Sequence, residues 1–527
     1  MSKIKKVLAM LLALAMVLGT TLTTFAEAGV TPSENDSRKA TVNNVEATAT
    51  VTAYQVVKAD YDDGFTGYSA VKGVAIAEPT APTSDEITAI AKNLNNLSLK
   101  SVSMNIKENI NTETGLASFS GILNPGYWMI IVNGDVKEVY NPMLLGVYYS
   151  VSGSDNGMES GAVDANSNWT LETKDAYAKS TEPFIKKEIT DKDSNENANE
   201  NGGDVAVGDT VNYKITTKIP SYSKEYTSVE VNIKDELSVG LTLNHKAGEI
   251  KVSGVPSDKY TLNATDAGFL INIDSAWALA NGDTDITVVY SAKVNDQAKI
   301  NFDPNTNTAT LEYTNNPGGG TKTTKDETYT YTFGIGANLY GESEEAWNKI
   351  TKELIKVDNT IKEEITEDGG TVTVSKRLEG ATFTLTNDVT TKTYTATTGA
   401  DGILSFTGLD AGTYTLVETV APKGYTLSTT EHKVVIVADY NINGTLKSYS
   451  ITIDGAATST YTATYDGGKT EVSSITIVDK TTDINNTKLS ELPSTGGIGT
   501  TIFTIGGCLI MIAAAGLFFA SRRKSAK

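Results

Sequence analysis

The sequence runs Gly412-Thr-Tyr-Thr-Leu-Val-Glu-Thr-Val-Ala-Pro-Lys-Gly-Tyr425 in its last third, and this stretch limits the fold more narrowly than any other. Alternate side chains of a β-strand share a face, so Tyr414, Leu416 and Glu418 point to the same side of a strand. The first two belong in an apolar core, and Glu418 must follow them there. An isolated carboxylate is costly to bury while ionised, so Glu418 should be protonated or have a partner. The stretch predicts a strand that carries an acid into the core of a β-domain.

The same alternation recurs along the chain, with turn residues between the runs. Examples are residues 210–216, 382–385 and 414–417. Runs of this kind, rich in Val, Ile, Thr and Tyr, are typical of half-buried strands, and their regular spacing favours sandwiches over βαβ units. We therefore predict a mainly all-β chain, in which tandem β-sandwich domains with small helical insertions form a rod.

Composition shifts and turn-rich segments suggest where the domains begin and end. Boundaries near residues 180 and 335 give three central domains, at 29–180, 181–335 and 336–490. Short helices are expected at about residues 84–97 and 342–354. Polar, low-complexity stretches are expected to form loops at about residues 191–204 and 315–326.

The composition argues against several classes of function. The 527 residues include 44 Lys and Arg against 64 Asp and Glu, a formal net charge of −20, and such an excess repels nucleic acid. There are two histidines, His245 and His432, and one cysteine, Cys508. This scarcity argues against a His/Cys zinc site, a Cys–His nucleophile pair and a disulfide framework. We expect no metal, no cofactor and no enzyme activity on an external substrate.

The N-terminus has the three parts of a secretory signal peptide. Met-Ser-Lys-Ile-Lys-Lys is basic, residues 7–18 are apolar, and small residues lead to Phe25-Ala26-Glu27-Ala28. Cleavage after Ala26 or after Ala28 fits equally well. We predict a signal peptide at residues 1–28 and an exported protein.

The C-terminus, residues 491–527, also has three parts in a fixed order. Leu492-Pro493-Ser494-Thr495-Gly496 precedes an apolar segment, residues 498–520, that is long enough to span a bilayer. Arg522, Arg523, Lys524 and Lys527 follow, and their charge keeps the tail cytoplasmic. This arrangement resembles the cell-wall sorting signal of Gram-positive surface proteins. The resemblance implies transient membrane retention, sortase cleavage between Thr495 and Gly496, and anchoring to the peptidoglycan cell wall at the cell surface.

The stretch around Glu418, with Leu378-Glu-Gly-Ala-Thr-Phe383 and Leu354-Ile-Lys-Val-Asp358 upstream, resembles the Cna B-type (prealbumin-like) domain of Gram-positive pilins and adhesins. In that family, a glutamate in this strand promotes an amide (isopeptide) bond between lysine and asparagine side chains. The resemblance implies that Glu418 promotes such a bond here. Lys356 is favoured over Lys376 as the lysine, and Asn486, with Asn485 as the alternative, is the asparagine.

The middle domain carries a second set of the same residue types. In Pro183-Phe-Ile-Lys-Lys-Glu-Ile189, Lys187 shares a face with Ile185 and Ile189, whereas Lys186 lies between Phe184 and Glu188. Asp235 likewise lies between Ile233 and Leu237, and Asn307 shares a face with Ala309, Leu311 and Tyr313. The order resembles the second domain of backbone pilins, an Ig-like sandwich with a Lys–Asn bond assisted by Asp. The resemblance implies a Lys187–Asn307 bond promoted by Asp235.

The first domain resembles the N-terminal domain of the same pilins, and no Lys/acid/Asn set is recognisable in it. Its last residues, Asp175-Ala-Tyr-Ala-Lys-Ser180, place Lys179 where that family has its pilin lysine, although Ala178 stands in place of the usual proline. The resemblance implies a structural shaft subunit of a pilus, in which sortase joins Thr495 to Lys179 of a neighbouring subunit. It also implies cell adhesion, with minor pilins and host surface ligands as further partners. The alternative is a monomeric wall-anchored adhesin or a pilus-base subunit built from the same domains.

Overall fold

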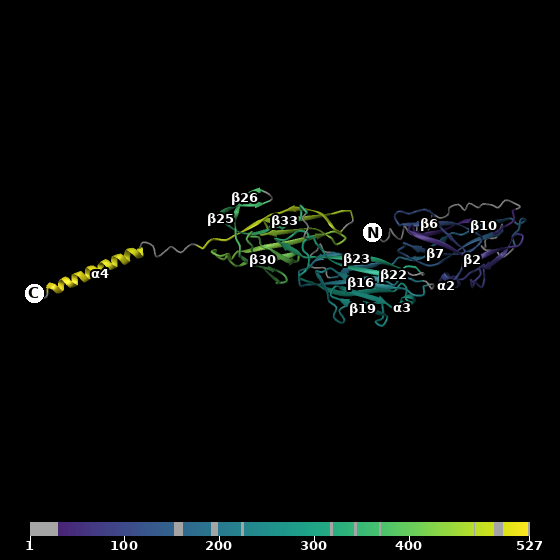
Figure 1. Ribbon diagram of the computed structural model, residues 1–527, viewed down its shortest axis with the longest axis horizontal. Coiled ribbons are helices and arrows are strands. Elements are labelled where there is room, and N and C mark those ends of the chain that lie inside the picture. Colours follow the sequence, from purple (N-terminus) through teal and green to yellow (C-terminus); the bar gives the residue numbers. More distant parts are fainter. Residues whose placement is uncertain are drawn as a thin grey trace.

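The computed structural model describes nine segments of the chain, which are residues 30–151, 162–190, 199–222, 226–316, 320–341, 345–367, 370–467, 470–489 and 499–524. The signal peptide expected at 1–28 and the sorting motif expected at 492–496 lie outside them. The described chain consists mainly of strands, which confirms the all-β prediction. Three groups of sheets follow one another along the long axis in chain order, and a long helix extends beyond the last group (Figure 1).

The first group is built from two main sheets. One has the order β11–β1–β6–β5, and the other has the order β10–β9–β7–β2–β3 with β4 also paired to β2. Their bounds are β1 (Arg38–Glu46), β2 (Ala49–Tyr61), β3 (Phe65–Ala70), β4 (Ser101–Ser103), β5 (Ile106–Glu108), β6 (Leu116–Leu123), β7 (Gly126–Gly134), β9 (Met143–Val151), β10 (Trp169–Thr173) and β11 (Ala176–Tyr177). A small sheet pairs β8 (Val139–Tyr140) with β12 (Ser180–Thr181).

A helix covers part of the first group. Helix α2 (Ser84–Lys92) begins at a capping box formed by Thr83 and Glu86, and it buries Ile87 and Ile90. These two side chains belong to one apolar cluster with residues of β2 and β7. The helix expected at residues 84–97 is therefore present, although it ends at residue 92 and a short 3₁₀ turn follows (Leu94–Asn96).

The second group is a sandwich, since one apolar cluster takes side chains from both of its sheets. The first sheet has the order β13–β15–β21–β17, with β18 also paired to β21, and the second has the order β14–β23–β22–β16–β20–β19. Their bounds are β13 (Ile185–Ile189), β14 (Gly202–Asp204), β15 (Thr210–Lys218), β16 (Val231–Leu237), β17 (Leu241–Leu243), β18 (Lys251–Ser253), β19 (Tyr260–Thr265), β20 (Gly268–Ile273), β21 (Asp285–Val294), β22 (Asn305–Thr314) and β23 (Thr321–Tyr331). Helix α3 (Ser275–Ala280) connects β20 to β21.

The third group has a large antiparallel sheet with the order β28–β27–β30–β31–β32–β33–β34. Two smaller sheets accompany it, one with the order β26–β25–β35 and one that pairs β24 with β29. The bounds are β24 (Phe333–Ile335), β25 (Leu354–Glu367), β26 (Gly370–Arg377), β27 (Thr382–Asn387), β28 (Thr393–Thr397), β29 (Phe406–Leu409), β30 (Gly412–Val420), β31 (Glu431–Tyr440), β32 (Leu446–Ile453), β33 (Ala457–Tyr465), β34 (Val472–Val478) and β35 (Thr482–Asn485).

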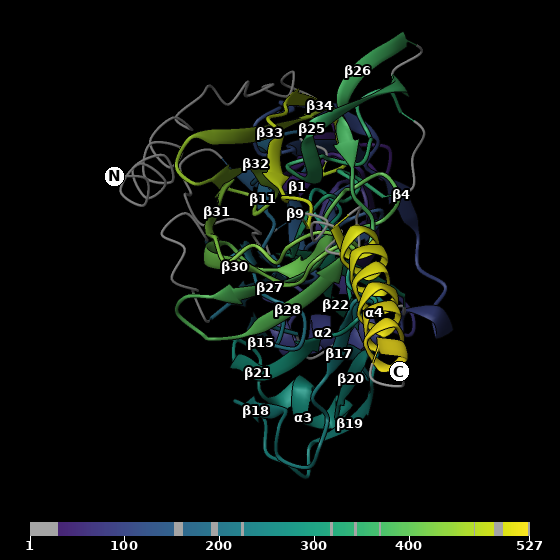
Figure 2. The same cartoon turned by 90° about the vertical axis from the view of Figure 1, so that its left-hand side faces the viewer.

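Two features of the third group affect the site. The outer parts of β25 and β26 form a hairpin that projects from the body of the group (Figure 1 and Figure 2). Strand β24 ends at residue 335 yet pairs with β29, so the chain enters the third group before residue 336.

Three local predictions are wrong at least in part. In the loop expected at 191–204, residues 202–204 form β14, which pairs with β23. In residues 345–353, which belong to the helix expected at 342–354, the structure has turns and an isolated bridge instead. Thr351 and Glu353 there hydrogen-bond to the backbone of Ala337 and Gly336, and such tertiary contacts override helix propensity. In the loop expected at 315–326, residues 321–326 belong to β23, because each of them pairs with β22.

Hydrogen bonds connect the first group to the second. Tyr313 on β22 donates through its hydroxyl to the carbonyl of Lys137, and Asn315 Nδ2 donates to the carbonyl of Val136 (3.2 Å). Val139 of the first group also belongs to the apolar core of the second.

The second and third groups meet around Asp204. Its carboxylate accepts from the hydroxyl of Tyr440 (2.6 Å) and from the backbone N–H of Ala411 (2.6 Å). Nearby, Lys392 of the third group forms an ion pair with Asp209 (3.0 Å). Because Asp204 is buried, this junction excludes water at its centre.

Candidate functional site

The middle group brings Lys187, Asp235 and Asn307 together, and we call these three residues the middle triad. Lys187 comes from β13, Asp235 from β16 and Asn307 from β22, so the triad spans both sheets of the sandwich. Their exposed fractions are 0%, 1% and 0%. Strand alternation explains the choice of lysine, because the neighbouring Lys186 points outward and pairs with Glu188 and Glu200.

A buried tyrosine joins the middle triad. Lys187 Nζ lies 2.5 Å from Asp235 Oδ2, and it also donates to the hydroxyl of Tyr290 on β21. That hydroxyl donates to Asp235 Oδ2 (2.6 Å) and accepts from Asn307 Nδ2 (3.2 Å). Sequence reasoning missed Tyr290. Its position between the inward-facing Val288 and Ala292 was the available signal, since it places a buried hydroxyl in the core.

Burial controls the charges of the middle triad. Loss of water lowers the pKa of the Lys187 amine, although Asp235 acts in the opposite direction. Loss of water also raises the pKa of the Asp235 carboxyl, and Lys187 opposes that shift. Both directions favour a neutral amine beside a protonated carboxyl. A neutral amine has the free electron pair that a nucleophile needs.

The C-terminal group brings Lys356, Glu418 and Asn486 together, and we call these the C-terminal triad. Lys356 lies on β25 and Glu418 on β30, while Asn486 directly follows β35, which pairs in parallel with β25. Their exposed fractions are 1%, 3% and 2%. As the alternation in residues 412–425 predicts, Glu418 lies in the core together with Tyr414 and Leu416.

The contacts in the C-terminal triad are direct. Lys356 Nζ donates to Asn486 Oδ1 (2.6 Å) and lies 3.1 Å from Glu418 Oε1. Asn486 Nδ2 donates to the same Oε1 (3.0 Å), and the backbone N–H of Ser428 donates to Glu418 Oε2 (2.6 Å). Burial lowers the pKa of the Lys356 amine, while Glu418 acts in the opposite direction. The amine also lies 5.1 Å from the centre of the Phe383 ring, which keeps one side of it apolar.

The alternative residues lie outside this triad. Lys376, on β26, is half-buried and pairs across the sheet with Asp358. Asn485 is exposed, and its Oδ1 accepts from the backbone N–H of Asn359 (2.9 Å). The geometry therefore favours Lys356 and Asn486 over these two residues.

Both triads have the parts that amide formation needs. A neutral lysine amine attacks the carboxamide carbon, and the neighbouring acid polarises the carboxamide and passes a proton to the departing nitrogen. The core holds the groups in place and excludes water. Such a reaction would yield one Lys–Asn amide and one ammonia molecule, so each triad could react only once.

Lys179 lies in an accessible position at the end of the first group. It is exposed and separates β11 from β12. Its carbonyl accepts from the backbone N–H of Asn141 (3.2 Å), which fixes the main chain while the side chain faces solvent.

The expected C-terminal sorting residues Leu492, Pro493, Ser494, Thr495 and Gly496 lie outside the described residues. The segment that follows them is helix α4 (Gly499–Lys524), which contains a span, Ile502–Arg522, apolar and long enough to cross a membrane. Its described side chains are almost all exposed, as expected for a segment whose surroundings are lipid.

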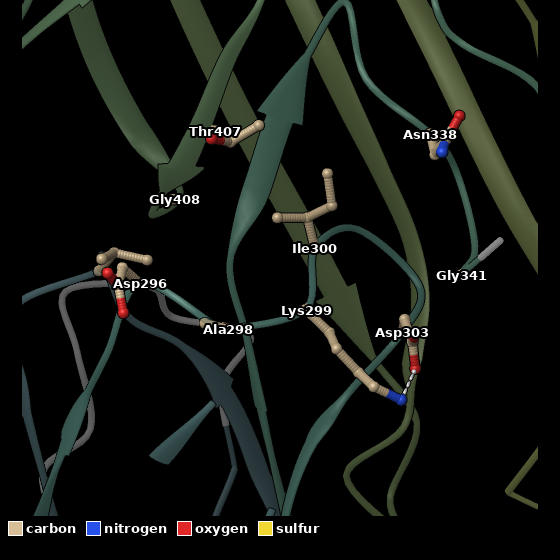
Figure 3. A pocket seen from close by; sticks show the side chains of 10 residues that line it. Asp296, Ala298, Lys299, Ile300, Asp303, Asn338, Gly341, Thr407 and Gly408 are labelled. Atoms are coloured by element: carbon tan, nitrogen blue, oxygen red, sulfur yellow. Dashed lines mark hydrogen bonds and ion pairs between the residues drawn. The ribbon is translucent and has the colours of Figure 1, made fainter. Parts of the chain in front are cut away.

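A cleft of about 690 Å³ lies at the junction of the second and third groups. Figure 3 shows Lys299 paired with Asp303 on one side of it (3.0 Å), with Thr407 and Gly408 across from them. None of the lining residues belongs to either triad. Within the described part of the chain, no group of three or more His, Cys, Asp or Glu side chains could hold a metal ion.

Four family models match the chain, one after another. They are a T6 antigen Ig-like domain at residues 35–180, a Gram-positive pilin backbone subunit 2, Cna-B-like domain at 207–317, a prealbumin-like fold domain at 371–450, and an LPXTG cell wall anchor motif at 484–527. The first three fall on the three groups of sheets. The anchor motif covers Asn486, the sorting motif and α4.

The whole chain is similar to known surface proteins. The trypsin-resistant surface T6 protein of Streptococcus pyogenes serotype M6 is 27% identical over 545 residues, which cover 94% of this chain and 96% of the relative. The solved T6 backbone pilin of serotype M6 Streptococcus pyogenes has the same fold, with a TM-score of 0.60 and 22% identity over 87% of this chain and 100% of that chain. The full-length major pilin SpaD from Corynebacterium diphtheriae matches more distantly, with a TM-score of 0.42 and 16% identity over 88% and 100% of the two chains.

Proposed function

We propose that this chain, which belongs to the Gram-positive backbone pilins, is the shaft subunit of a covalent pilus that sortase assembles and attaches to the peptidoglycan cell wall. One observation carries the proposal, namely that a pilin backbone domain and a cell wall anchor motif occur in the same chain. The family is structural, so the chain is a substrate of sortase and has no external substrate of its own. The proposal keeps the expected domains at 29–180, 181–335 and 336–490, between the signal peptide and the sorting signal, with β24 at the end of the second stretch paired to β29 of the third group.

The joining reaction uses two positions far apart in the chain, Thr495 near the C-terminus and Lys179 after the first group of sheets. A sortase cysteine attacks the carbonyl of Thr495, the Thr495–Gly496 bond breaks, and the Gly496 amine leaves with a proton. The Lys179 amine of a neighbouring subunit then attacks the resulting thioester, which forms an amide and releases the cysteine. Exposure of Lys179 supports this role, because a nucleophile must reach an acyl group that another protein holds.

Within each subunit, we propose that the middle triad forms a Lys187–Asn307 amide and the C-terminal triad a Lys356–Asn486 amide. Asp235 and Glu418 are the acids that promote them. The support is geometric, since each triad is buried and places an amine, an acid and a carboxamide within a connected set of hydrogen bonds. Disulfides cannot serve instead, because the one cysteine, Cys508, lies in α4.

Substitution of Lys179 tests the polymer. The variant Lys179→Ala, expressed with a pilin-class sortase, should yield monomers, and electrophoresis of wall extracts should show no ladder of covalent multimers. The matched control is Lys174→Ala, which removes another exposed lysine from the same segment and should leave the ladder unchanged. An unchanged ladder in Lys179→Ala would show that another lysine is the nucleophile.

The same experiment separates the alternative function. A monomeric wall-anchored adhesin or a pilus-base subunit would keep the sorting motif and the internal amides, yet the wild-type chain would form no multimers with itself. For the assembled fibre, we propose minor pilins and host surface ligands as additional partners, in keeping with a role in adhesion. A wild-type chain that stays monomeric beside its sortase would favour the adhesin.

A further inference from the structure

Tyr290 occupies the centre of the middle triad. Its exposed fraction is 2%, and its ring packs between Tyr213 (5.4 Å between ring centres) and Phe269 (4.9 Å). Packing on both sides fixes the ring, and with it the position of the hydroxyl. The hydroxyl contacts Lys187, Asp235 and Asn307, so it touches every member of the triad.

The two triads differ in the atom that connects the reacting groups. In the C-terminal triad, the carboxyl oxygen Oε1 of Glu418 lies 3.1 Å from the amine of Lys356 and 3.0 Å from the carboxamide nitrogen of Asn486. In the middle triad, the oxygen that hydrogen-bonds to both the amine and the carboxamide nitrogen is the phenol oxygen of Tyr290. Asp235 Oδ2 contacts this phenol and the amine, and the carboxyl also interacts with the Asn307 side chain.

We propose that Tyr290 is a further catalytic residue of the Lys187–Asn307 reaction, with its hydroxyl as the relay that carries a proton from the attacking amine to the departing nitrogen. This role rests on the internal amide proposed above. Asn307 Oδ1 is buried and has no hydrogen-bond partner among the described residues. The hydrogen bond to Tyr290 is therefore made by the carboxamide nitrogen, Asn307 Nδ2. This nitrogen must gain a proton before it can leave as ammonia.

The relay moves two protons, and the reaction breaks one C–N bond for the one that it forms. The neutral Lys187 amine attacks Asn307 Cγ, a C–N bond forms, and the carboxamide carbon becomes tetrahedral. The phenol oxygen takes one proton from the amine nitrogen and gives its own to Asn307 Nδ2. The Cγ–Nδ2 bond then breaks and ammonia leaves, which yields the Lys187–Asn307 amide with Tyr290 again neutral. Before the transfer, Asp235 Oδ2 accepts from the phenol and orients it. Once the carboxamide carbon is tetrahedral, Asn307 Nδ2 becomes basic and the phenol proton turns from Asp235 to this nitrogen.

The variant Tyr290→Phe tests the relay, because it removes the hydroxyl and keeps the ring. Wild type and variant are made as the full mature chain by timed translation, stopped with acid, and weighed intact. Wild type should lose two ammonia molecules. Tyr290→Phe should lose one promptly and the second on the order of 10²-fold more slowly, in line with the contribution of a positioned proton-transfer group. Peptide mapping should place the slow bond at Lys187–Asn307 and the prompt one at Lys356–Asn486.

The matched control is Tyr313→Phe. It removes another buried hydroxyl from the same core, on the strand that carries Asn307, and that hydroxyl bonds to the carbonyl of Lys137 and touches no triad member. This variant should lose both ammonia molecules at the wild-type rate. Loss of both at the wild-type rate by Tyr290→Phe would overturn the relay and leave the proposed amides intact. Failure of wild type to lose any would instead overturn the amides, and the relay with them.

A second variant guards against a folding defect. A fluorinated tyrosine at position 290 keeps the ring and the hydroxyl but makes the phenol more acidic. If the hydroxyl relays a proton, the rate of the second ammonia loss should change severalfold while the rate at Lys356–Asn486 stays constant. An unchanged rate at both sites would overturn the relay, since a hydroxyl with a purely structural role does not respond to its own acidity.

Discussion

Burial of the Lys187 and Lys356 amines beside an acid favours amide formation in each triad. A buried amine and carboxyl lose their hydration, and an ion pair in such a place repays that cost only with very good geometry. Conversion to the proposed amide would replace the amine and the carboxamide by one neutral group, so no buried ammonium would remain. The covalent bond therefore replaces an arrangement that stabilises the domain little with one that cannot dissociate.

Substitution of Lys356 should affect one triad alone. The variant Lys356→Ala should lose one ammonia molecule, where wild type loses two, and intact-mass measurement reads this directly. It also removes the proposed covalent link between β25 and residue 486, so the C-terminal group should unfold at a lower temperature than in wild type. Lys376→Ala is the control and should keep both bonds. Loss of a bond in Lys376→Ala, with Lys356→Ala unaffected, would reverse the assignment.

For single residues, the alternation of inward and outward side chains along a strand predicted the triad residues but not Tyr290. It pointed Lys187 inward and Lys186 outward, because neighbours in one strand differ in face. It could not place Tyr290 beside Lys187, since these residues are far apart in the sequence and meet only through pairing of β13, β15 and β21. Contacts between strands depend on register, which a single sequence does not reveal.

Strand β20 packs closely against the part of β16 that carries Asp235, and this pairing fixes the position of Asp235. Gly268 begins β20 with φ of +141°, and a Cβ atom at that position would lie 2.0 Å from the carbonyl oxygen of Asp235. Glycine is therefore required there both for the backbone conformation and for space. The two strands pair from Asn232 to Glu236, so a shift at Gly268 displaces the segment that carries the acid.

The variant Gly268→Ala should separate β20 from β16 and destabilise the middle group by about 1–3 kcal/mol, as overpacking does elsewhere. Calorimetry should show a lower unfolding temperature for that group, and intact mass should show an incomplete Lys187–Asn307 bond. Gly467→Ala is the control, because a Cβ atom at Gly467 would meet nothing within 4 Å. Equal unfolding temperatures for the two variants would contradict this role of Gly268.

Elements were predicted best where the local pattern and the tertiary packing agree. The helix near residues 84–92 has its own cap and an apolar face, and it forms. The segment from 345 to 353 has a similar composition, yet its side chains bond to the backbone of the preceding turn and no helix forms. The polar residues 321–326 lack apolar alternation and nevertheless belong to β23, since their backbone completes the ladder with β22.

On the scale of the whole molecule, direct contacts hold the three groups in sequence. Asp204 is central to the second junction, because it is buried and accepts hydrogen bonds from two groups across the boundary. Removal of such an acceptor leaves the hydroxyl of Tyr440 and the N–H of Ala411 without it, at a cost of about 1–3 kcal/mol for each.

The variant Asp204→Ala should therefore loosen the angle between the second and third groups. Small-angle X-ray scattering should show a broader distribution of maximum dimensions, and limited proteolysis should cut sooner near the junction. Asp209→Ala, which removes a half-exposed ion pair with Lys392, should change both measurements little. Equal behaviour of the two variants would place the stiffness of the junction elsewhere.

The order of the groups and the C-terminal anchor were predictable from motifs alone. The junctions were not, because they depend on side chains such as Asp204 and Tyr440 that are distant in sequence and carry no motif. The early entry of β24 into the third group was missed for the same reason, since its partner, β29, lies far along the chain.

The parallel pairing of β25 with β35 has a mechanical consequence for the proposed fibre. When a fibre is pulled, tension enters a subunit at Thr495 and reaches Asn486. An amide from Asn486 to Lys356 passes it straight to the neighbouring strand, so residues 357–485 are bypassed. The tension then runs back along the chain to Asn307.

There the second amide diverts it to Lys187, past residues 188–306, and it leaves the subunit at Lys179. Residues 30–178 lie beyond that exit. Most of the polypeptide therefore lies off the line of tension, which follows residues 308–355 between the two amides. In the proposed fibre, residues 188–306 and 357–485 could therefore change in sequence without lying on the path that carries the tension.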